Sequence, residues 1–106
     1  MALPGKERAR RFELQIPLRY RANGDSQWHR GIMKNISSSG VLFQGEDRTG
    51  PNTPVEISFV LPKRILGEEA AEVVCRGTVT RSQPSAESDD LSLLATTISS
   101  YRFVRP

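Results

Sequence analysis

The sequence contains few of the residues from which catalytic and metal sites are built. Its 106 residues include one cysteine, Cys75, and one histidine, His29. A single cysteine cannot form an internal disulfide, and these two residues do not supply the ligand set of a zinc site or a marked catalytic triad. Neither a P-loop nor a dinucleotide-binding fingerprint occurs. We therefore expect a protein that is not an enzyme, with no catalytic residues, no metal site and no cofactor.

Long hydrophobic runs are also missing. The longest apolar stretches are only a few residues, as in Phe59-Val60-Leu61, and the N-terminal segment turns basic without an apolar block behind it. These features predict no membrane insertion and no secretory signal peptide, and they favour a cytoplasmic location. A chain of this length is expected to fold as one domain with one small core.

Helical periodicity is scarce, whereas strand signals recur between turn residues. The fourth strand is the clearest, because Val55, Ile57, Phe59 and Leu61 alternate with polar residues. Six such segments indicate an antiparallel barrel or sandwich. The expected strands cover residues 12–22, 28–36, 41–44, 55–61, 71–81 and 91–98. The expected inward-facing residues include Val41, Phe43, Ile57, Phe59, Leu61, Val79 and Leu93. Residues 99–106 are expected to begin a short C-terminal helix.

The net charge is only +3, but the cations are placed unevenly. Within six residues the N-terminal segment holds Lys6, Arg8, Arg10 and Arg11, opposed only by Glu7. We expect residues 1–11 to form a flexible basic arm and residues 12–106 to form the barrel domain. Arginine binds phosphate through two parallel hydrogen bonds and also reads guanine edges. The arm therefore suits an anionic ligand, and a merely solubilising tail is the alternative.

A second candidate site follows the expected second strand. The segment Asn35-Ile36-Ser37-Ser38-Ser39-Gly40 offers an amide and several hydroxyl groups, and Gly40 permits a backbone conformation closed to other residues. An ordinary Ser-Gly turn is the alternative, because turns of this composition are common.

Taken together, the two segments resemble the PilZ domain family, bacterial receptors for cyclic di-GMP. That family is marked by an R-x-x-x-R arm and, some twenty-odd residues later, by a D/N-x-S-x-x-G motif. Asn35, Ser37 and Gly40 match the second motif in full. In the first motif Arg11 takes the second arginine position, but Glu7 stands where the first arginine is expected, and Arg8 lies one position late. The resemblance implies a six-stranded antiparallel barrel, often with a C-terminal helix.

The resemblance also implies a function. A PilZ domain would bind cyclic di-GMP through Arg8, Arg10 and Arg11, with hydrogen bonds from Asn35 and Ser37 and a turn shaped by Gly40. It would then relay the signal to a protein partner that the sequence does not identify. Glu7 keeps open an adaptor that has lost the nucleotide and binds only protein. A small basic barrel that binds RNA or single-stranded DNA ranks third, because most of the aromatic residues are better explained as core.

Overall fold

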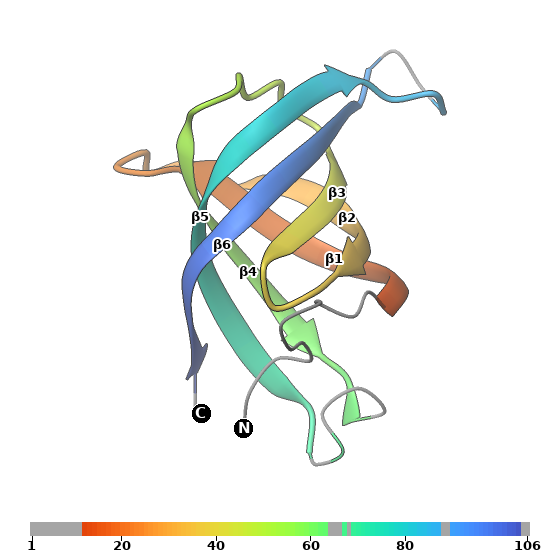
Figure 1. The fold of residues 1–106 in the computed structure, drawn as a ribbon, viewed down its shortest axis with the longest axis vertical. Coiled ribbons are helices and arrows are strands. Elements are labelled where there is room, and N and C mark those ends of the chain that lie inside the picture. The colour runs from red at the N-terminus through yellow and green to blue at the C-terminus, as the bar shows by residue number, and fades with distance from the viewer. Residues whose placement is uncertain (1–11, 64–66, 68, 88–89, 105–106) are drawn as a thin grey trace.

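The computed structural model describes residues 12–63, 67, 69–87 and 90–104, and for residues 12–14 it describes the backbone only (Figure 1). The basic arm therefore lies outside the described residues. The six predicted strands are all present, and the first has the predicted bounds. Their bounds are β1 Phe12–Ala22, β2 His29–Ile36, β3 Gly40–Gly45, β4 Pro54–Leu61, β5 Ala71–Pro84 and β6 Ser92–Val104.

The strands close into a barrel in the order β1-β2-β3-β6-β5-β4, with β4 paired back onto β1. Every neighbouring pair is antiparallel. The six-stranded antiparallel barrel expected from the sequence is thus confirmed. Because the barrel is closed, β3 and β6 lie on the opposite side from β1 and β4, and the two sides can carry different surfaces.

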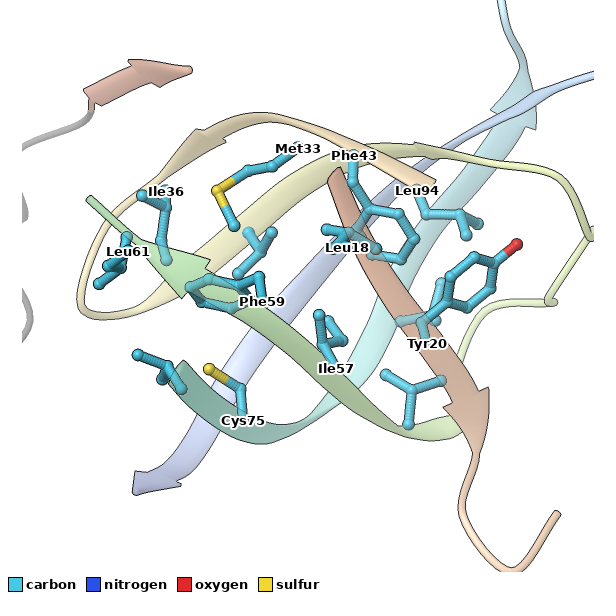
Figure 2. Close-up of a cluster of buried hydrophobic side chains, with 14 residues drawn as sticks. Leu18, Tyr20, Met33, Ile36, Phe43, Ile57, Phe59, Leu61, Cys75 and Leu94 are labelled. Atoms are coloured by element: carbon cyan, nitrogen blue, oxygen red, sulfur yellow. The ribbon is translucent and has the colours of Figure 1, made fainter. Parts of the chain in front are cut away.

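Alternate residues of the strands point inward and fill the barrel (Figure 2). Six of the seven expected inward-facing residues are buried, whereas Leu93 is not. Its neighbour Leu94 is completely buried instead, so the sequence prediction placed β6 one residue out of phase. The two adjacent leucines gave no local signal of which one faces the core. The buried core consists of Leu18, Tyr20, Met33, Ile36, Val41, Phe43, Val55, Ile57, Phe59, Leu61, Val73, Cys75, Val79 and Leu94.

The C-terminal segment corrects a second expectation. Residues 99–104 continue β6 as a strand rather than beginning a helix, because they pair with the first half of β5. Tyr101 and Phe103 pack against the core, and their rings meet edge to face with centroids 6.0 Å apart. Pairing in the sheet satisfies the backbone of this segment and keeps its two aromatic rings on the barrel. Residues 105–106 lie outside the described part of the chain.

Gly24 allows the chain to turn after β1. It has φ of 87°, and the Asp25 amide donates to the Ala22 carbonyl at 2.9 Å. Only Gly24, and not Asn23, takes the left-handed conformation, so the connection is a longer loop rather than a two-residue hairpin turn. This loop lies at the end of β1 that is farthest from Phe12.

Candidate functional site

The segment between β2 and β3 forms a tight turn that is closed by its own serines. The Ser37 amide donates to the Gly40 carbonyl at 2.9 Å. The Ser39 amide donates to Ser37 Oγ at 3.2 Å, and the two hydroxyl oxygens are 3.1 Å apart. Ser37 is only 3% exposed, whereas Ser39 is exposed. The hydroxyl of Ser37 therefore shapes the turn, and that of Ser39 faces solvent.

Gly40 is needed here for a reason other than the one expected. Its φ is not in the left-handed region, so its backbone conformation is open to other residues. A Cβ at this position would instead lie 2.8 Å from the carbonyl oxygen of Thr96 on β6. The same region is bound to β6 by the Ile98 amide, which donates to the Ser39 carbonyl at 2.9 Å. Glycine thus allows β3 and β6 to pair closely directly after the turn.

The first strand brings the base of the basic arm to this turn. Phe12 pairs with Ile36 and Glu13 pairs with Asn35, so β1 begins beside the residue that precedes Ser37. Arg11 is bonded directly to Phe12, and chain connectivity keeps Arg8 within at most about 14 Å of Phe12 Cα. The described residues do not include the arm, so the contacts of Arg8, Arg10 and Arg11 stay a prediction. Their attachment point nevertheless lies next to the second motif.

On the outer face of the barrel, a row of residues continues from the motif across four strands. Asn35 pairs with Leu42, Leu42 with Ala95, and Ala95 with Arg81. Val41 and Phe43 point inward, so Leu42 and its cross-strand partners share the outer face. Asn35 is half-buried and Arg81 is exposed. The row thus runs from an amide at the turn, over two apolar side chains, to a cation.

A shallow pocket of about 160 Å³ lies along this row, lined by Leu42, Arg81, Gln83, Leu93 and Ala95. Three of its lining side chains are apolar and two are polar, and Arg81 supplies a cation, so it can hold a flat ring beside an anionic group. The sequence analysis did not identify Arg81 as a candidate. No local signal marks it, because its place in the row that begins at Asn35 depends on the β3–β6 and β6–β5 registers.

The loop between β5 and β6 is held over the outer face beside this pocket. Gln44 Nε2 donates to Ser85 Oγ at 2.5 Å, and the Glu87 amide donates to the same oxygen at 3.2 Å. Lys34 on β2 is 3.3 Å from a carboxylate oxygen of Glu87. These contacts tie the β5–β6 loop to β2 and β3.

The two remaining reactive side chains, Cys75 and His29, take part in packing. Cys75 is buried, and burial raises the pKa of its thiol to about 12, so it is not nucleophilic at neutral pH. His29 packs on Tyr20 with ring centroids 5.6 Å apart, and its imidazole nitrogens are 3.9 Å and 3.6 Å from Glu46 and Asp47 oxygens.

Within the described ranges, no three His, Cys, Asp or Glu side chains gather as a metal site would require. In the same part of the chain, no helix has the length and hydropathy to cross a membrane.

Comparison with known proteins agrees with this geometry. The family model of the PilZ domain matches residues 6–101, a range that includes both the basic arm from Lys6 and the Ser37–Gly40 turn. No curated protein matches the sequence significantly. Among solved structures, the inhibitor of motility MotI/DgrA of Bacillus subtilis is similar in fold, with a TM-score of 0.71 and 14% sequence identity. The match covers 90% of this chain but only 43% of that protein, so the likeness concerns one part of a longer chain.

Proposed function

Because the chain belongs to the PilZ domain family, a family of cyclic di-GMP receptors and adaptors rather than enzymes, we propose that it binds cyclic di-GMP and relays the signal to a protein partner in the cytoplasm. The observation that carries this proposal is the pairing of Phe12 with Ile36. It attaches the basic arm directly beside the Ser37–Gly40 turn. This proximity supports the assignment of the two motifs, which are separated in sequence, to one site.

The charges and shapes around the turn support a ligand of this class. Cyclic di-GMP carries two phosphates and two guanines, and arginine recognises both groups through paired hydrogen bonds. Arg11, Arg10 and Arg8 are within reach from the arm, and Arg81 approaches from the opposite end of the outer row. The apolar floor between them, formed by Leu42 and Ala95, gives a guanine ring a surface on which to lie.

Calorimetric titration with cyclic di-GMP, with GTP and with a single-stranded oligonucleotide tests the proposal. We expect cyclic di-GMP to bind and the other two ligands to bind weakly or not at all. Arg11→Ala and Arg81→Ala should each weaken cyclic di-GMP binding by about 5- to 150-fold, the effect of one lost arginine contact of about 1–3 kcal/mol. Arg102→Ala removes another exposed cation, on the far half of β6, and serves as the matched control.

A second candidate function is an adaptor of the same fold that binds only protein. Two observations favour it: Glu7 occupies the position of the first motif arginine, and the Ser37 hydroxyl is already bonded within the turn. The adaptor predicts no heat of cyclic di-GMP binding in the native chain. Preferential binding of the oligonucleotide would refute both candidates and support the nucleic-acid alternative.

A further inference from the structure

A groove of about 590 Å³ lies on the other side of the barrel, on the outer face of β1, β2 and β4. We call it the β1–β4 groove. Leu18 on β1 and Phe59 on β4 point into the core at this place (Figure 2), so their neighbours along each strand face outward. The groove's outer lining includes Pro17, Arg19, Arg30, Ile32, Val60 and Glu72.

The centre of this groove is unusually apolar for an outer barrel face. In the described part of the chain, Ile32 and Val60 are the two exposed large hydrophobic residues, with 37% and 53% of their surface accessible, and both line the groove. Pro17 pairs with Ile32 across β1 and β2 and is also exposed. Single exposed apolar residues are ordinary, but a contiguous group inside a concavity is typical of a binding surface.

Like charges meet at the rim. Arg19 and Arg30 are direct cross-strand partners, an arrangement that ordinarily destabilises a sheet. Both side chains are exposed, and within the described ranges neither has a carboxylate within ion-pair distance. The one acid in the lining, Glu72, accepts a hydrogen bond from Ser58 Oγ at 3.1 Å. Among the described residues, the rim therefore offers two arginine side chains that make no ion pair, although the Glu46 carboxylate accepts a hydrogen bond from the Arg30 backbone amide at 2.9 Å.

We propose that the β1–β4 groove docks a protein partner through an acidic segment that carries an aliphatic side chain. The aliphatic group would lie between Ile32 and Val60, and the carboxylates would pair with Arg19 and Arg30. This inference rests on the adaptor half of the proposed function. The groove and the Ser37–Gly40 turn both involve β1 and β2, but no residue of the turn lines the groove, so the partner and the nucleotide would occupy separate areas of the surface.

Charge and shape disfavour the other occupants. The chain's own arm carries Lys6, Arg8, Arg10 and Arg11, and a second copy would bring the same two rim arginines, so both repel the rim. Proteins that bind single-stranded nucleic acid commonly stack its bases on aromatic rings, but Arg19 and Arg21 already lie over the Trp28 ring at 5.2 Å and 4.3 Å from its centroid. A flat bilayer does not fill a concave groove.

The test is a titration of the isotope-labelled protein, without nucleotide, followed by amide chemical shifts. The probe is a short synthetic peptide of glutamates and leucines. Its two matched forms replace every glutamate by lysine or every leucine by serine. We expect the glutamate–leucine peptide to shift the amides of Arg19, Ile32 and Val60 but not those of Ser39 and Gly40, and both matched forms should bind about fivefold more weakly or worse.

Two variants locate the site, and one serves as control. Arg30→Glu and Val60→Ser should each weaken the peptide by about fivefold or more, whereas Arg48→Glu, an equal charge reversal at an exposed residue outside the groove, should not. All three positions are exposed, so the fold should persist, and thermal melting checks this.

Several results would overturn the proposal: no shift of groove amides, equal binding of the lysine peptide, or an Arg48→Glu effect equal to that of Arg30→Glu. It would equally fail if the groove amides responded instead to self-association, to an oligonucleotide or to vesicles of phosphatidylglycerol and phosphatidylcholine. Failure of cyclic di-GMP to bind in the separate calorimetric titration would refute only the receptor proposal, because the peptide titration contains no nucleotide.

Discussion

The two sides of this barrel are built in different ways. On the motif side, the Ser37–Gly40 turn is held by its own hydrogen bonds, and its residues are neighbours in sequence. On the opposite side, the β1–β4 groove is lined by residues of four strands, β1, β2, β4 and β5, with no local motif. A site made from one segment can be identified from a sequence pattern, whereas a site made from strand registers becomes visible only in the closed barrel. A change on one side is therefore expected to leave the other side intact.

The largest effect is expected at Glu7. Restoring R-x-x-x-R by Glu7→Arg removes a repulsion of about 0.5–1 kcal/mol at 6–8 Å from a phosphate. It also adds a forked contact of about 1–3 kcal/mol, so cyclic di-GMP should bind about ten- to a few hundred-fold more tightly. Calorimetry measures this, and Asp25→Arg, the same charge change beyond the far end of β1, is the control. Tight native binding that Glu7→Arg leaves unchanged would show that Lys6 and Arg10 are the motif pair instead.

On the motif side, Gly40→Ala should lower the stability of the fold. Its Cβ would lie 2.8 Å from the Thr96 carbonyl oxygen, a backbone atom that moves only if β3 and β6 separate. We expect a loss of about 1–3 kcal/mol in the free energy of unfolding, measured by urea denaturation. Gly50→Ala, where no atom lies near the added carbon, is the matched control and should change stability little. Equal stability of the two variants would contradict the close approach of β3 and β6.

At high pH, ionisation of two buried core residues should lower the free energy of unfolding of the whole barrel, and so affect both sides. Burial raises the pKa of Tyr20 from 10.0 to about 12, and burial raises that of Cys75 from 9.0 to about 12. Both groups bind their protons more tightly in the folded chain, so this stability is intact below pH 9 and falls as pH rises toward 12. Each group adds a slope of about 1.4 kcal/mol per pH unit within its window. Urea denaturation between pH 8 and 11 should show a shallower decline for Cys75→Ala than for the native chain, and parallel slopes would contradict the assignment.

The two neighbouring serines should differ. Ser37→Ala removes the hydroxyl that accepts the Ser39 amide, which should cost about 0.5–1.5 kcal/mol of stability. Among the described contacts, Ser38 takes no part in the hydrogen bonds between Ser37 and Ser39, so Ser38→Ala should change stability less. If Ser37 also bonds the ligand, as the family motif predicts, cyclic di-GMP affinity should fall further for this variant alone. Equal losses for both serines, in melting and in calorimetry, would show that the motif is misaligned.

The smallest effect on stability is expected in the groove. Val60 has 53% of its surface accessible, so Val60→Ser should change the free energy of unfolding by no more than about 0.5 kcal/mol. Cyclic di-GMP affinity should also stay unchanged, because Val60 lies on the opposite side of the barrel. A large change in either measurement would mean that the two sides are coupled.

Local sequence patterns were enough to locate the strands and the second motif. Strand-like segments between turn residues located all six strands, with the clearest alternation in β4, and the D/N-x-S-x-x-G pattern identified the turn because its residues are contiguous. The same local signals could not assign the phase of Leu93 and Leu94, nor the strand that replaces the expected C-terminal helix. Both depend on what pairs with β6.

Only the tertiary structure decided which distant residues meet. Closure of β1 onto β4 and pairing of β3 with β6 bring Phe12 beside Ile36, Arg81 into line with Asn35, and Val60 beside Pro17. A shift of one residue in any of these registers would turn each side chain to the other face of the sheet. The periodicity of each strand is a local property, but its register is set by packing against partners that lie far away in the chain.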